Sequence, residues 1–203
     1  KCGPDYIDPM FHSRVIGAKS SNLDSFFFDR DTMRYLLAHN TQGCDVTVIE
    51  GVMGYYDGLG LTSTRASTYA AARETSSPVV LVVNARGAAL SVLASVEGFL
   101  HFAPDSGIQG VILNGCSAMS YGPLSRELEN RLGVRACGYL PRLPEWALGG
   151  RHLGLITADE VADLQEKLRK LAAVAEKTLD FAALLEIARS APPLDFTPPV
   201  LPE

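Results

Sequence analysis

Short apolar runs alternate with stretches of helical periodicity along most of this sequence. Three runs, at 45–49, 79–83 and 111–113, are rich in β-branched residues, and a weaker one lies at 134–140. Runs that are apolar on both faces are typical of strands covered on both sides, as in a parallel sheet. The alternation therefore predicts an α/β fold, an open and mostly parallel sheet with helices on both faces.

The stretches between and after these runs predict the helices. Apolar residues recur there at helical spacing, and Thr157 and Glu160 form a capping box before one of the later helices. We expect the later helices to pack at the edge of the sheet. The predicted helices span 31–40, 64–75, 88–102, 124–132, 161–174 and 180–189.

The composition excludes several classes of protein. The 203 residues include 47% hydrophobic and 20% charged residues, unlike a disordered or collagen-like chain. The net charge of −5 argues against nucleic acid as a partner. Because no apolar run approaches the roughly 18 residues of a membrane helix and the four cysteines form no Cys-x-x-Cys pair, we expect a reduced, cytoplasmic protein without a membrane partner.

Neither end of the chain shows the alternation of apolar runs and helical stretches. Residues 1–28 show no clear periodicity and are rich in polar side chains, and a loop of this length is uncommon unless it is functional. Lys1 could contact a phosphate and Asp5 a metal, or the segment could be a flap whose polar residues face water. Prolines cluster after Ala191, so we expect one domain over 1–190 and an extended linker over 191–203.

The first apolar run ends directly in a carboxylate. Glu50 is followed by glycines, with Asp57 on the same loop. Ligands of open α/β sheets bind beyond the carboxyl ends of the strands, where a carboxylate can hold Mg²⁺ beside a nucleotide phosphate. A solvated Glu before a glycine turn is the other interpretation.

Other candidate motifs fit poorly. Gly17-Ala-Lys-Ser20 resembles the end of a phosphate-binding loop, but the second glycine and the flanking strand and helix are missing. Cys116 lacks the glycines of a nucleophile elbow, which favours a bystander thiol. Asn114 ends the third run, where its amide could pair with a nucleobase or cap the strand.

Six short motifs follow one another over most of the chain. They are Lys1-Cys-Gly-Pro-Asp-Tyr-Ile-Asp-Pro9, Asn22-Leu-Asp24, Ile49-Glu-Gly-Val-Met-Gly-Tyr-Tyr-Asp-Gly58, Gly110-Val-Ile-Leu-Asn114, Gly138-Tyr-Leu-Pro-Arg142 and Arg151-His-Leu-Gly-Leu155. Together they resemble the synthetase domain of the cobyrinate a,c-diamide synthase family of the cobalamin pathway. The first and third motifs are the most specific.

The resemblance implies a P-loop NTPase-like fold and an ATP-dependent carbon–nitrogen ligase. ATP and Mg²⁺ would convert the a and c carboxylates of a corrinoid into acyl phosphates, which ammonia from glutamine would attack. It assigns catalysis to Lys1, Asp5, Glu50 and Asp57, Mg²⁺ to Asp5 and Glu50, the corrin to Tyr6 and Ile7, and the adenine to Asn114, Leu140, Pro141 and Arg142.

The sequence departs from the family around these motifs. The family's P-loop precedes the first motif and its glutaminase domain follows the last, and neither is within these residues. Residue 84 is Asn where the family's pattern has Asp, which leaves the role of Asn84 open. We therefore expect this stretch alone to hydrolyse neither ATP nor glutamine, and to work with a glutaminase domain on a longer chain; a homodimer is left open.

Two other functions remain open at this point. A diamide synthase for another tetrapyrrole, such as nickel-sirohydrochlorin, would carry the same two specific motifs. A P-loop switch ATPase that positions a partner would share the fold, although the long segment 1–28 favours an enzyme.

Overall fold

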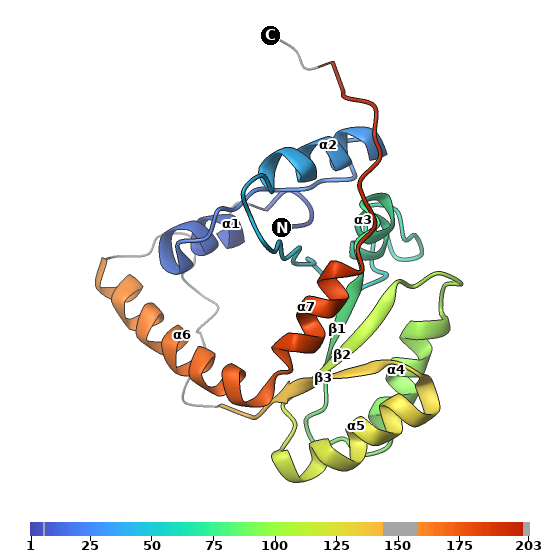
Figure 1. Cartoon of the computed structure of the whole chain (residues 1–203), viewed down its shortest axis with the longest axis vertical. Helices are drawn as coiled ribbons and strands as arrows, with labels where there is room; N and C mark the ends of the chain where they lie inside the picture. Colours follow the sequence, from blue (N-terminus) through green and yellow to red (C-terminus); the bar gives the residue numbers. More distant parts are fainter. Residues whose placement is uncertain (6, 144–157, 201–203) are drawn as a thin grey trace. The chain divides into compact units, whose positions relative to one another are not determined.

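The computed structural model describes residues 1–5, 7–143 and 158–200 (Figure 1). The chain divides into two compact units. One contains Lys1–Ser77 and the described residues 158–161 and 191–200, and the other contains residues 78–143 and 162–190.

A parallel three-stranded sheet forms the centre of the second unit. Its strands, in the order β1-β2-β3, are β1 (Val79–Asn84), β2 (Ile108–Asn114) and β3 (Arg135–Leu140). Each parallel neighbour requires a crossover connection, and the helices α4 (Ser91–His101) and α5 (Ala118–Leu132) provide them. Three of the four predicted strands are therefore confirmed, as are the two helices between them.

Helices cover both faces of this sheet. Side chains alternate between the faces along a strand, so Val111 and Leu113, both with 0% exposure, lie on one face of β2 and Ile112 on the other. Helix α4 packs on β1 and α5 on β3, while α7 (Phe181–Arg189) contacts β2 and β3 and buries Ile187 in a cluster with Ile112. This confirms the α/β prediction and is consistent with a P-loop NTPase-like fold, but α7 packs on a face of the sheet rather than at its edge.

The junction between α6 (Ala158–Thr178) and α7 lies directly against β3. Gly138 forms an antiparallel bridge with Leu179 and has a φ of +114°. A Cβ at this position would lie 2.4 Å from the carbonyl oxygen of Thr178, so only glycine fits. Asp180 then caps α7 by accepting a hydrogen bond of 2.9 Å from the Ala183 amide. The predicted capping residue of α6, Thr157, lies outside the described residues.

The first unit consists of helices joined by irregular segments. Helices α2 (Arg30–Asn40) and α3 (Thr68–Glu74) contact each other, and Met33, with 0% exposure, lies in a core with Ala71, Leu23 and Cys2. Side-chain oxygens cap both helices, because Asp29 and Ser67 accept hydrogen bonds from amides in the first turn. The helix predicted at 31–40 is confirmed, and the one predicted at 64–75 is shorter.

Two predictions for the first unit are wrong. The run 45–49 is not a strand, and Val46 and Val48 are 46% and 84% exposed. A strand needs a neighbour that pairs its amides and carbonyls, and no described segment forms a ladder with this run. Residues 1–28 are more regular than predicted, since they contain α1 (Ile7–Phe11) and a π-helical turn, His12–Ile16.

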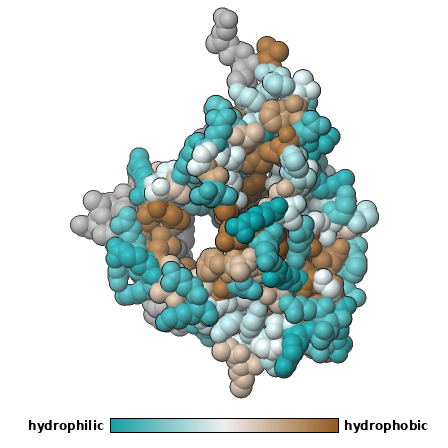
Figure 2. Space-filling view, viewed as in Figure 1, coloured by the Kyte–Doolittle hydropathy of each residue, from teal (hydrophilic) through white to brown (hydrophobic). Residues whose placement is uncertain are grey.

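The surface mixes polar and apolar side chains (Figure 2). No helix among the described residues is long and apolar enough to cross a membrane. Large hydrophobic side chains that are exposed in the first unit include Phe26, Phe27, Phe28, Met53 and Leu61.

Candidate functional site

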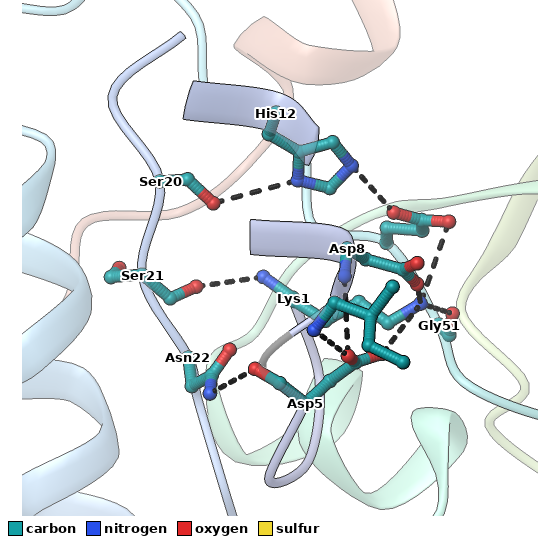
Figure 3. Close-up of polar contacts among 10 residues, drawn as sticks. Lys1, Asp5, Asp8, His12, Ser20, Ser21, Asn22 and Gly51 are labelled. Carbon is teal, nitrogen blue, oxygen red and sulfur yellow. Dashed lines mark hydrogen bonds and ion pairs between the residues drawn. The ribbon is translucent and has the colours of Figure 1, made fainter. Parts of the chain in front are cut away.

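Three segments of the first unit meet around Lys1 (Figure 3). The Cys2 amide donates to the carbonyl of Glu50 at 2.8 Å, and the Gly3 amide donates to the carbonyl of Leu23 at 2.8 Å. The Leu23 amide returns a bond of 2.8 Å to the carbonyl of Lys1. These backbone bonds bring the predicted site residues Lys1 and Glu50 together, although they are far apart in the sequence.

The Lys1 ammonium lies among three carboxylates. Its Nζ is 2.5 Å from Asp8 Oδ2, 3.4 Å from Glu50 Oε1 and 3.8 Å from Asp5 Oδ2. It also donates a bond of 3.0 Å to the carbonyl of Gly51. The Lys1 side chain is only 4% exposed, and an ammonium this buried is tolerated because acceptors and negative charge surround it.

The closest ion pair shifts the pKa of both partners. Burial by itself lowers the pKa of the Lys1 ammonium, but the hydrogen bond to Asp8 and the charges of Glu50 and Asp8 outweigh it, so this pKa is raised. The hydrogen bond from Lys1 lowers the pKa of Asp8. Both groups are therefore charged at neutral pH.

Asp5 connects this cluster to α1. Its Oδ1 accepts hydrogen bonds from the amides of Ile7 and Asp8, at 2.8 and 3.2 Å, and so caps the start of the helix. The Asn22 side-chain amide donates to the Asp5 carbonyl at 2.7 Å. Asp5 is therefore held through its side chain and its backbone, with Oδ2 left facing Lys1.

The cluster has two further members that the sequence motifs do not predict. Asp8 forms the shortest ion pair with Lys1, and His12 Nε2 lies 3.0 Å from Glu50 Oε2. The signal was present, because positions 5, 8 and 12 follow the spacing of three and four that places side chains on one helical face. The hydrophobic pattern of residues 1–28 predicts no helix, so this spacing alone does not identify the two residues.

Asp5 and Glu50 could hold Mg²⁺ only together with other ligands, such as those of a nucleotide. Within the described residues, no group of three or more His, Cys, Asp and Glu side chains is arranged to hold a metal ion by itself. However, Mg²⁺ is commonly bound by one or two carboxylates, and phosphate oxygens and water complete its shell. Asp5 and Glu50 share the Lys1 ammonium and can supply two such carboxylates.

The other predicted site residues of this unit lie near the cluster or outside it. Ile7 is 46% exposed and lines an open hollow of about 260 Å³ with Pro4, Asp5 and Val52. Asp57 is exposed on the loop after Glu50, and the structure does not bring it into the ion-pair network. Tyr6 lies outside the described residues.

The predicted nucleotide-binding residues belong to the second unit. Asn114 and Leu140 end β2 and β3 and are partners in the sheet register. Pro141 and the exposed Arg142 follow directly. These four residues therefore gather at the carboxyl ends of neighbouring strands, where open α/β sheets bind ligands.

Cys116 is buried beside these strand ends. It is 3% exposed, and burial raises the pKa of its thiol, which disfavours the nucleophilic thiolate. The prediction that this cysteine is a bystander agrees with that environment.

Three comparisons with known proteins gave different results. No family model matches the chain, and no solved structure matches it. Curated proteins named cobyrinate a,c-diamide synthase do match. Those of Listeria monocytogenes, Salmonella typhimurium and Archaeoglobus fulgidus are each 39% identical to it, over 98%, 93% and 96% of this chain. The chain spans 44%, 41% and 43% of their lengths, a little under half. The predicted resemblance to the cobyrinate a,c-diamide synthase family is therefore confirmed, and it extends over nearly the whole of this chain.

Proposed function

We propose that the intact protein amidates the a and c carboxylates of cobyrinate, using ATP, Mg²⁺ and ammonia derived from glutamine. The observation that carries this proposal is the similarity to curated cobyrinate a,c-diamide synthases along almost the entire chain. The Lys1 cluster supports it, since phosphoryl-transfer sites combine a lysine with carboxylates that hold Mg²⁺.

The proposed reaction has two steps, formation of an acyl phosphate and its attack by ammonia. A substrate carboxylate oxygen attacks the γ-phosphorus of ATP, so that ADP leaves and an acyl phosphate forms. Ammonia then attacks the acyl carbon, a proton is lost, and inorganic phosphate leaves with the former carboxylate oxygen. Activation is needed because a free carboxylate is a poor acyl donor.

The chain's own residues have separate proposed roles in these steps. Asp5 and Glu50 would hold Mg²⁺, which when bound offsets the charge of the transferring phosphoryl group. Lys1 would contact phosphate oxygens or the acyl phosphate, and Asp57 the nucleotide or metal. Tyr6 and Ile7 would face the corrin, and the strand ends at Asn114 and Leu140, with Pro141 and Arg142, would flank the adenine.

The proposal extends beyond these residues. A glutaminase domain of the intact polypeptide would release the ammonia, and the reaction would take place in the cytoplasm. We also propose that residues 1–203 alone do not turn over ATP, because none of the described segments forms a strand, glycine-rich loop and helix that would cradle phosphates. Gly17 instead ends the π-helical turn.

The test is a substrate comparison with the intact protein. Cobyrinate and nickel-sirohydrochlorin are each incubated with Mg-ATP and glutamine, and the products are identified by mass spectrometry while ADP is measured. We expect the diamide of cobyrinate and about two ADP per diamide, since each amide consumes one ATP. Amidation of nickel-sirohydrochlorin alone would establish the other tetrapyrrole as substrate, and ATP hydrolysis without any amide would favour the switch ATPase.

A further inference from the structure

Neighbouring side chains hold the carboxylate of Glu50 in one orientation. The Glu50 side chain is 48% exposed, so without these partners it would rotate freely in solvent. Two groups hold it, one at each oxygen. Lys1 Nζ lies 3.4 Å from Oε1, and His12 Nε2 lies 3.0 Å from Oε2.

The imidazole of His12 is itself held on its other side. Ser20 Oγ lies 3.4 Å from His12 Nδ1, a long contact compared with the bond to Glu50. A carboxylate can only accept, so Nε2 must carry the hydrogen that points at Glu50. In the neutral ring Nδ1 then accepts from the Ser20 hydroxyl, which gives a chain of donors from Ser20 through His12 to Glu50.

The backbone fixes the position of His12 relative to Asp5. His12 begins the π-helical turn that directly follows α1, and Asp5 caps the start of α1. The His12 carbonyl accepts a bond of 2.9 Å from the Ala18 amide, and Gly17 ends the turn with a φ of +76°. One short segment therefore orients both carboxylates that are proposed to hold Mg²⁺.

We propose that His12 is a positioning residue for Glu50. Its Nε2–H holds one carboxylate oxygen, so that the other stays directed toward Lys1 and the proposed ion site. Groups that orient metal ligands in this way typically contribute 10-fold to 100-fold in metal affinity or activity. The role of Glu50 as a ligand rests on the proposed function, but the hydrogen bond from His12 does not.

The experiment compares His12→Ala, His12→Asn and His12→Gln in the intact protein. The amide nitrogen of Gln can reach the position of Nε2, whereas that of Asn reaches only the position of Nδ1. We expect Ala and Asn to raise the half-saturating Mg²⁺ concentration for amidation by about 10-fold, while Gln restores most of the loss. Titration with Mn²⁺, followed by electron paramagnetic resonance, measures the same change as weaker ion binding without depending on turnover.

Two controls separate positioning from a general structural role. His39→Gln changes an exposed histidine of α2 that is outside the cluster, and we expect no effect on Mg²⁺ or Mn²⁺. In a Glu50→Gln background, His12→Ala should cause no further loss of Mn²⁺ affinity, because the group that it orients is already neutral.

The outcomes distinguish this proposal from the proposed function. If Gln is as impaired as Ala, or if all three variants bind Mn²⁺ like the wild type, the positioning role is refuted. If the wild type forms no amide from either tetrapyrrole, the proposed function is refuted, and the Mn²⁺ titrations still decide the role of His12. The Gln and Asn pair, matched for polarity, remains decisive if the Ala variant does not fold.

Discussion

Glu74 is a partly buried carboxylate at the end of α3, and no cation among the described residues forms an ion pair with its side chain. Burial raises its pKa, and its Oε2 is buried without a hydrogen-bond partner in the described structure. The nearby Arg34 donates to the Glu74 carbonyl, at 2.6 Å, rather than to the carboxylate. The position at a helix C-terminus adds an unfavourable interaction with the helix dipole.

We expect Glu74→Gln to stabilise the protein at neutral pH. A carboxyl whose pKa is higher in the folded state than in the unfolded state lowers stability as pH rises from the unfolded pKa to the folded pKa. The reason is that the unfolded chain ionises the group more easily. The gain should therefore be present at pH 7, shrink as pH falls through the raised pKa toward the ordinary value of about 4.5, and be absent below it. Thermal unfolding of the intact protein across this pH range measures it.

Glu97→Gln is the matched control for this prediction. Glu97 is exposed on α4, and substitutions at such surface positions usually change stability by less than about 0.5 kcal/mol. An equal gain in both variants, or a Glu74→Gln gain that persists at low pH, would show that burial of this carboxylate is not the cause.

Single residues were predictable from sequence where a motif fixes their chemistry. Lys1, Asp5 and Glu50 converge as expected. Asp8 and His12 were missed because their membership depends on helical turns that the hydrophobic pattern of residues 1–28 does not reveal. Asp57 shares a loop with Glu50, but the turn that follows, with the Asp57 amide donating to Gly54, leaves its side chain exposed.

At the scale of elements, prediction succeeded where neighbours complete the structure. The runs at 79–83 and 111–113 pair with each other, and helices pack on them. The run at 45–49 also contains β-branched apolar residues, but no described strand lies beside it and Val48 remains exposed. An apolar pattern indicates that a segment favours burial, whereas a strand also needs a neighbouring strand to pair its backbone amides and carbonyls.

Gly138 tests how tightly the α6–α7 junction packs on β3. Gly138→Ala should destabilise the protein by about 3 kcal/mol or more, because the positive φ strains an L-residue and the Cβ would overlap backbone atoms of Thr178 and Leu179. Chemical denaturation of the intact protein measures the change.

Gly98→Ala in α4 should change the stability of the protein in the opposite direction to Gly138→Ala. A Cβ at position 98 meets nothing within 4 Å, so alanine should stabilise the helix by about 0.5–1 kcal/mol. A neutral Gly138→Ala variant would mean that the junction does not pack against β3 as described.

At the scale of the molecule, the two units contribute different parts of the proposed chemistry. The first contains the Lys1 cluster, and the second contains the strand ends at Asn114 and Leu140. The chain spans 41% to 44% of the relatives it resembles. The complete reaction is therefore a property to be measured on the intact protein.

The transfer of oxygen from substrate to phosphate tests the central claim most directly. Cobyrinate labelled with ¹⁸O in its carboxylates is converted by the intact protein with Mg-ATP and glutamine, and the released phosphate is analysed by mass spectrometry. Amidation through an acyl phosphate predicts one ¹⁸O in the inorganic phosphate for each amide formed. Amide formation with unlabelled phosphate, or with the label in AMP, would contradict it.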